Sequence, residues 1–136
     1  MLNIDEKIRR KLVADAERTF PDECCGFLFG HENGPDRRIV EMTVVDNAKE
    51  GDRRRRFEIS PRDYLQAERH ALEKGWELLG IYHSHPDHPA VPSEHDRVAA
   101  QPYFSYVILS VLGGRYDGLR SWRLNDDARF DEEPVG

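Results

Sequence analysis

Residues 76–96 read WELLGIYHSHPDHPAVPSEHD, and this stretch constrains how the rest of the chain is arranged. Its first seven residues are mostly apolar, which is typical of a buried central strand. Side chains alternate between the two faces of a strand, so His83 and His85 point the same way while Ser84 points to the other side. Pro86 offers no backbone N–H and ends the strand pairing. The stretch therefore predicts a central strand that carries two histidines at its end.

Further strands are expected on either side of this one. Residues 103–114, YFSYVILSVLGG, predict a second buried central strand. The apolar run CCGFLFG at 24–30 is too short for a helix, and a turn signal separates it from 38–45, which are rich in β-branched residues. We expect these two segments to pair as antiparallel strands. Weaker strand patterns lie at 57–60 and 117–124.

Three helices complete the predicted order of elements. From Ile4 to Phe20 an apolar residue recurs every four positions, which predicts an amphipathic helix that ends at Pro21. Ser60-Pro61 is typical of a helix start, and this helix should run to about Lys74 and stop at Gly75. A short helix is expected in the segment that starts at Pro92. This order predicts an α/β sandwich with a mixed sheet, as a single domain at 1–125 followed by a polar C-terminal tail at 126–136.

Composition and charge exclude several classes of protein. At 136 residues the chain is the size of one domain, and its net charge of −6 gives no general attraction to nucleic acid or to an anionic membrane. No stretch approaches the ~20 apolar residues that span a bilayer, and the N-terminal residues lack the apolar core of a signal peptide. The adjacent Cys24 and Cys25 are read as free thiols, since a bridge between neighbours would strain the peptide. We therefore expect a cytoplasmic protein.

The only basic run is Arg53-Arg54-Arg55-Arg56, which lies among acidic residues. A solvated loop is the simpler interpretation. The alternative is a patch that meets an acidic peptide or a terminal carboxylate, and the sequence leaves both open.

Four polar residues of the opening stretch have the spacing of a metal site. His83 and His85 can share one ion at the end of their strand. Ser93 and Asp96 are three residues apart, which on a helix places them on one face, so both side chains can point toward the histidines. Two nitrogens and one carboxylate form the ligand set of a catalytic zinc site, which keeps a fourth position for water.

Each half of this pattern also has a purely structural interpretation. Ser93-x-x-Asp96 resembles a capping box, and His-x-His could be a strand end exposed to water. These interpretations explain less well why two histidines, a proline break and an acidic helix start occur in one short segment. Because Asp96 cannot serve fully as both cap and ligand, we expect it to be a ligand.

Hydrolysis also needs a group that takes a proton from water and later delivers it to the leaving group. Glu23 stands immediately before the apolar run at 24–30, where a strand could set it beside the site. Asp22 is equally available on periodicity alone.

The complete pattern resembles a known family. His83-x-His85, seven residues, then Ser93-x-x-Asp96 is similar to the JAMM motif of the MPN-type (Mov34/MPN/PAD-1) metalloproteases. The upstream segment at 21–26, PDECCG, is similar to the glutamate-bearing segment of the bacterial members. The resemblance covers most of the chain, from the first helix to the strand at 103–114. It implies an MPN (JAB) domain, in which helices sandwich a mixed sheet with a cytidine-deaminase-like layering.

The resemblance also implies a role for each motif residue. His83, His85 and Asp96 would bind one catalytic Zn²⁺, with water at the fourth position. Glu23 would be the general acid/base, and Ser93 would help to stabilise the oxyanion of the tetrahedral intermediate. All five residues are present, which argues against the inactive scaffold members of the family.

The other histidines and the cysteines lie outside the motif. We expect His88 and His95 to face solvent, and Cys24 and Cys25 to pack in the core. Neither the Cys-x-x-Cys nor the His-x-Glu motif of zinc deaminases occurs, so that class is disfavoured.

The short chain resembles the stand-alone bacterial members, which act on ubiquitin-like sulfur-carrier proteins. The resemblance implies a peptidase that cuts after the C-terminal Gly-Gly of such a carrier, either releasing cysteine or trimming an extension. Two alternatives are a JAMM peptidase of phage-tail or cell-wall type and a non-catalytic MPN binding module.

Overall fold

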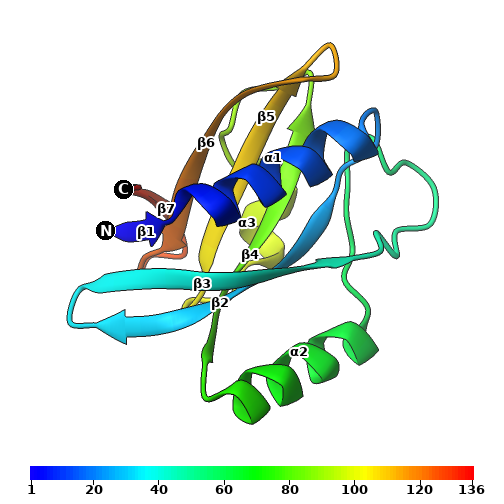
Figure 1. The fold of residues 1–136 in the computed structure, drawn as a ribbon. Coiled ribbons are helices and arrows are strands. Elements are labelled where there is room, and N and C mark those ends of the chain that lie inside the picture. The colour runs from blue at the N-terminus through cyan, green and yellow to red at the C-terminus, as the bar shows by residue number, and fades with distance from the viewer.

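A computed structural model describes all residues, 1–136, and shows one seven-stranded mixed sheet with helices on both faces (Figure 1). The strand order is β1-β3-β2-β4-β5-β6-β7. In chain order the elements are β1 (Leu2–Ile4), α1 (Glu6–Thr19), β2 (Cys25–Asn33), β3 (Asp36–Val45), α2 (Pro61–Lys74), β4 (Glu77–Pro86), α3 (Glu94–Ala99), β5 (Ser105–Leu112), β6 (Arg115–Leu124) and β7 (Phe130–Glu133). The predicted α/β sandwich with a mixed sheet is confirmed.

The strand that carries His83 and His85, β4, lies at the centre of the sheet. β4 pairs antiparallel with β2 and parallel with β5, which is the second predicted central strand. A parallel neighbour cannot be reached by a tight hairpin, so the chain must cross over between the two strands. The crossover at 87–104 contains α3, and it starts directly behind the two histidines of β4.

Each face of the sheet has its own core. α1 lies across one face, where its residues Ile8 and Leu12 pack against Leu28, Tyr82 and neighbouring side chains. α2 covers the other face, and its small residues Ala67 and Ala71 let Phe27, Phe29 and Ile81 approach closely. Because Ile81 belongs to the face of α2, His83 and His85 also lie on that face.

Helix ends follow the capping residues. Asp5 caps α1 by accepting a hydrogen bond from the N–H of Ile8. The expectation that this helix starts at Ile4 is therefore wrong, because Ile4 lies in β1 and pairs with β3. The second helix ends as predicted, with Ser60 as N-cap and Gly75 in the left-handed conformation at φ 71°.

Two weaker predictions differ from the structure. Residues 57–60 form no strand, because they have no neighbouring strand; they pass the end of β4, where Phe57 stacks on His83, and lead into α2. The expected tail at 126–136 contains β7, which pairs with β6. The last residues then return to β1, where the N–H of Leu2 donates to the carbonyl oxygen of Pro134, so both ends of the chain lie side by side (Figure 1). No helix is long and apolar enough to cross a membrane.

Candidate active site

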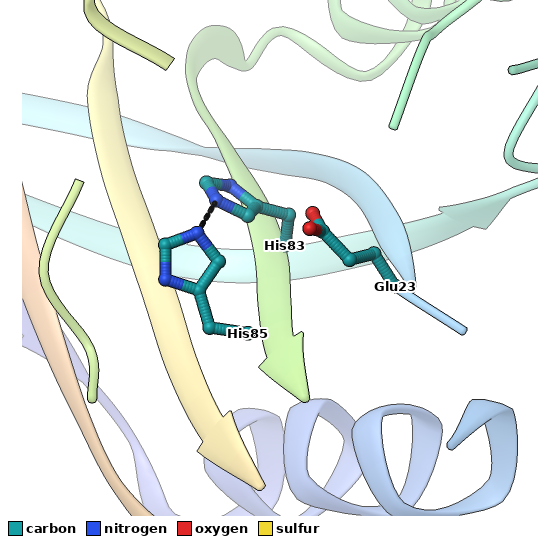
Figure 2. A group of neighbouring side chains, drawn as sticks. All are labelled: Glu23, His83 and His85. Carbon is teal, nitrogen blue, oxygen red and sulfur yellow. Dashed lines mark hydrogen bonds between the residues drawn. The ribbon is translucent and has the colours of Figure 1, made fainter. Parts of the chain in front are cut away.

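Two histidine side chains from the end of β4 face each other. The Nε2 atoms of His83 and His85 are 3.2 Å apart, and both side chains are buried (Figure 2). The alternation of the strand places them together, as expected, while Ser84 points to the opposite face. There the Ser84 hydroxyl accepts a hydrogen bond from the N–H of Cys24 at 2.8 Å.

The start of α3 brings Asp96 to the same point. Its Oδ2 atom lies 3.1 Å from Nε2 of His85 and 3.4 Å from Nε2 of His83. Four ligands arranged tetrahedrally at about 2.0 to 2.1 Å from a zinc ion would be about 3.3 to 3.4 Å from one another. The three donor atoms of the chain therefore already have the spacing of one face of such a tetrahedron.

Different contacts hold the two imidazoles. Nδ1 of His85 lies 3.2 Å from the carbonyl oxygen of Pro89, to which it can donate, and the tautomer that does so leaves the lone pair of Nε2 facing the site. The His83 ring is stacked on Phe57 with ring centres 4.5 Å apart. Nδ1 of His83 is buried without a hydrogen-bond partner.

Asp96 and Ser93 also form a capping box at the start of α3. The Ser93 hydroxyl accepts from the N–H of Asp96 at 3.1 Å, and Oδ2 of Asp96 accepts from the N–H of Ser93 at 2.9 Å. The same Oδ2 atom faces the two histidines. A carboxylate oxygen has lone pairs for both contacts, so Asp96 caps the helix while it faces the histidines, and its role as a metal ligand stays a prediction.

Glu23 reaches the site from the segment before β2. Its carboxylate points toward the histidines (Figure 2), and a donor atom of Glu23 lies within 4.8 Å of those of His83 and His85. Two backbone contacts hold this segment in place: the N–H of Glu23 donates to the carbonyl oxygen of Arg53 at 2.7 Å, and its own carbonyl accepts from the Asn47 side chain. Asp22, the alternative that the sequence left open, is not part of the cluster.

Burial dominates the electrostatics of Glu23. Its side chain is 2% exposed, and Oε1 has no hydrogen-bond partner. Loss of hydration, followed by the nearby charge of Asp96, raises the pKa of Glu23 to about 9, while Arg56 acts in the opposite direction. The buried carboxyl group is therefore held protonated near neutral pH until a positive charge arrives beside it.

The ligand candidates show the opposite preferences. Burial lowers the pKa of His83 and keeps its imidazole neutral, which is the form that binds a metal. Burial would raise the pKa of Asp96, but the neighbouring histidines and the N–H of Ser93 outweigh it and hold that pKa well below its usual range. A neutral imidazole and an ionised carboxylate are both ready to coordinate a cation.

Residues outside the motif lie as the sequence indicated. His88 and His95 are exposed, and Cys24 and Cys25 are buried free thiols. Burial raises the pKa of Cys25 to about 12, so its thiol stays protonated.

Two pockets flank the site, and no local pattern in the sequence predicts either of them. One has a volume of about 250 Å³ and is mostly apolar; Phe57, Tyr64 and Tyr106 line it beside His83. The other, of about 290 Å³, contains Arg55 and Arg56 together with His85 and Ser93. The arginine run is visible in the sequence, but nothing in the run shows that it lies next to His85 and Ser93.

Known proteins of one family are similar to this chain over most of its length. The family of prokaryotic homologues of the JAB domain matches residues 5–125. The chain belongs to the prokaryotic JAB family. The resemblance to JAMM metalloproteases is thereby confirmed, and the protein is a hydrolase of the JAMM type.

Named relatives of this JAB protein are a CysO-cysteine peptidase and a desampylase. It is 39% identical over 128 residues to the CysO-cysteine peptidase of Mycobacterium tuberculosis, a match that covers 91% of this chain and 82% of that protein. It is 29% identical over 113 residues to the desampylase of Pyrococcus furiosus, covering 83% and 74% of the two chains. A Desulfitobacterium hafniense protein of known solution structure has the same fold, with a TM-score of 0.87 and 31% identity over 99% of this chain and 91% of the other.

The JAB site fits a metal ion by its own chemistry. Three buried groups, Glu23, His83 and His85, cluster around one point, and Oε1 of Glu23 has no partner in the protein. Buried polar atoms without partners are costly, and a bound cation would remove that cost for the groups that face it.

Proposed function

We propose that this protein is a zinc-dependent peptidase that cuts after the C-terminal Gly-Gly of a ubiquitin-like sulfur-carrier protein, releasing cysteine or trimming a C-terminal extension. One observation carries the chemistry: three donor atoms of His83, His85 and Asp96 lie 3.1–3.4 Å from one another, with an unpaired buried carboxyl group beside them. The similarity to CysO-cysteine peptidase supports the choice of substrate.

His83, His85 and Asp96 would hold the zinc ion. Asp96 is preferred over Glu23 as third ligand because its oxygen lies within 3.4 Å of both Nε2 atoms, whereas Glu23 makes no hydrogen bond with either. A zinc ion in such a site supplies Lewis acidity, which polarises a carbonyl group and makes water a better nucleophile at neutral pH.

Glu23 would transfer the proton. Its carboxylate takes a proton from the attacking water and passes it to the nitrogen of the leaving amine, so that the amine departs neutral. Burial raises the pKa of Glu23 in the metal-free protein, and a cation beside it would favour the ionised form that can take a proton from water.

Ser93 would stabilise the negative oxygen of the tetrahedral intermediate. Its Oγ atom accepts the N–H of Asp96, which orients the hydroxyl group and leaves its proton free to donate. Because this hydrogen bond also starts α3, the helix cap and the oxyanion donor are the same side chain.

The test uses the CysO protein of Mycobacterium tuberculosis joined through its C-terminal carboxyl group to cysteine, incubated with the zinc-loaded protein and analysed by mass spectrometry. We expect loss of one cysteine residue with the wild-type protein. Glu23→Gln should retain one equivalent of zinc and lose cleavage by at least about 100-fold, the range of a removed general acid/base. A zinc-loaded wild-type protein that cleaves no diglycine carrier would refute the proposal.

The desampylases among the relatives favour a second candidate, the processing of a ubiquitin-like protein joined to another protein. The same assay with an isopeptide-linked conjugate separates the two candidates.

A further inference from the structure

The basic run at 53–56 has no place in the chemistry described so far, yet it lies against the active site. Arg55 and Arg56 line the pocket of about 290 Å³ that also contains His85 and Ser93. We infer that this pocket binds the free α-carboxylate of the leaving residue, and that Arg56 therefore selects substrates extended by a single amino acid. The inference rests on the proposed peptidase function and specifies its substrate.

The arginine segment is fastened to the segment that carries Glu23. The carbonyl oxygen of Arg53 accepts the N–H of Glu23 at 2.7 Å. The side-chain amide of Asn47 then donates to the carbonyl oxygens of both Glu23 and Arg56, at 3.2 and 3.0 Å. Three hydrogen bonds thus hold the backbone of the arginine segment against the backbone of Glu23. Such support fixes the place of a residue that contacts substrate.

Arg56 is a cation without a carboxylate partner. No acidic side chain lies within 4.0 Å of its guanidinium group, whose Nη1 donates only to the carbonyl oxygen of Arg55. The side chain of Arg55 pairs with Asp52 at 3.7 Å, where both are largely exposed. Arg56 is partly buried and has free donors, and a guanidinium group matches the two oxygens of a carboxylate with two parallel hydrogen bonds.

Charge assigns the leaving residue to this pocket. Glu23 would protonate the leaving nitrogen, and hydrogen bonds join its segment to the loop that carries Arg56, so the pocket of Arg56 is taken as the side of the leaving group. The apolar pocket on the side of His83 contains no lysine or arginine and has carboxylates from Glu58 and Asp96 in its wall. A free carboxylate would be repelled there and attracted to Arg56.

Distance restricts the length of the extension. The nitrogen of an amino acid and its carboxylate carbon are two bonds apart, about 2.5 Å through space. The carboxylate of a one-residue extension therefore stays next to the cut bond, where the pocket of Arg56 also includes His85 and Ser93. Each further residue moves the carboxylate away by about 3.3 to 3.6 Å, out of the reach of two parallel hydrogen bonds.

The test compares two substrates that differ in one charge. A thioester of the CysO protein is ligated to cysteine or to cysteinamide, which gives the same bond with a free or a blocked carboxylate. The zinc-loaded protein should cleave the free form with a kcat/KM about tenfold to 100-fold higher, the range for a hydrogen bond to a charged group. Arg56→Gln should bring this ratio close to one, and Arg56→Lys, which keeps the charge but not the paired donors, should give an intermediate ratio.

Arg54→Gln is the matched control. It removes the same charge from the same loop, but Arg54 is exposed and does not line the pocket, so the wild-type ratio should persist. Equal cleavage of both substrates by the wild-type protein would overturn the inference and leave the peptidase function intact. An Arg56→Gln variant with the wild-type ratio would overturn it too. If neither substrate is cleaved, the peptidase function on this carrier fails, and the inference fails with it.

Discussion

Glu23 should destabilise the metal-free protein, and Glu23→Gln should therefore stabilise it at neutral pH. Glu23 is 2% exposed as a residue, and its Oε1 atom has no hydrogen-bond partner. In the unfolded chain its pKa has the ordinary value of 4.5, whereas burial and the charge of Asp96 raise it to about 9 in the folded protein. A glutamine has similar shape and no charge to bury.

The sign of the effect follows from proton binding. Between pH 4.5 and about 9 the folded protein holds a proton on Glu23 that the unfolded chain has released. This contribution to stability is fully present below pH 4.5 and is lost progressively as the pH rises toward 9. The loss is about 1.4 kcal/mol per pH unit, which amounts to roughly 4 kcal/mol at pH 7.5 as an upper bound.

The variant recovers only part of this free energy. A buried glutamine amide without full hydrogen bonding costs about 1–3 kcal/mol at every pH. We therefore expect Glu23→Gln to be about 1–3 kcal/mol more stable than the wild type at pH 7.5 and equal or less stable at pH 5. Removing a group that is needed for activity would then stabilise the fold, as for other active-site residues.

The assay is urea unfolding in the presence of a chelator at pH 5, 6, 7 and 8, with stability taken from the midpoint and the slope. Asp22→Asn is the matched control, because it removes a neighbouring acid that lies outside the buried cluster. A difference between Glu23→Gln and wild type that stays constant from pH 5 to pH 8 would refute the argument. Saturating zinc should shrink the difference, since a cation beside Glu23 favours the ionised form.

Three further outcomes are expected. Zinc at 100 times its dissociation constant should raise the free energy of unfolding of the wild type by about 2.7 kcal/mol; His83→Ala should abolish this gain, while the exposed His88→Ala keeps it. Tyr82→Phe leaves the buried Oδ2 of Asp15 without its donor at 2.8 Å and should cost about 1–3 kcal/mol in urea unfolding, so an unchanged midpoint would contradict the buried hydrogen bond. In Gly80→Ala the added Cβ would lie 2.1 Å from a carbonyl oxygen of β5. Unfolding followed by circular dichroism should show that the variant loses at least about 3 kcal/mol of stability or does not fold. A variant as stable as the wild type would disprove this close approach of the two strands.

Local sequence patterns predicted most of the elements and the candidate site. The alternation in β4 placed His83 and His85 on one face, and the three-residue spacing placed Ser93 and Asp96 at one helix end, as the structure has them. Predictions from local signals were wrong where the secondary structure of a segment depends on the presence or absence of a neighbouring strand. Ile4 continues the helical period but pairs with β3, and 57–60 have a strand composition but no neighbouring strand with which to pair.

Strand and helix periods relate positions that are close along the chain, so local sequence was enough to group His83 with His85 and Ser93 with Asp96. The arrangement of these pairs around one point required the folded chain. The choice between Asp22 and Glu23 depends on a loop and a strand about sixty residues apart, and no local period connects them. The contact of the arginine loop with the Glu23 segment arises in the same way, from hydrogen bonds between distant backbone groups that form when the sheet assembles.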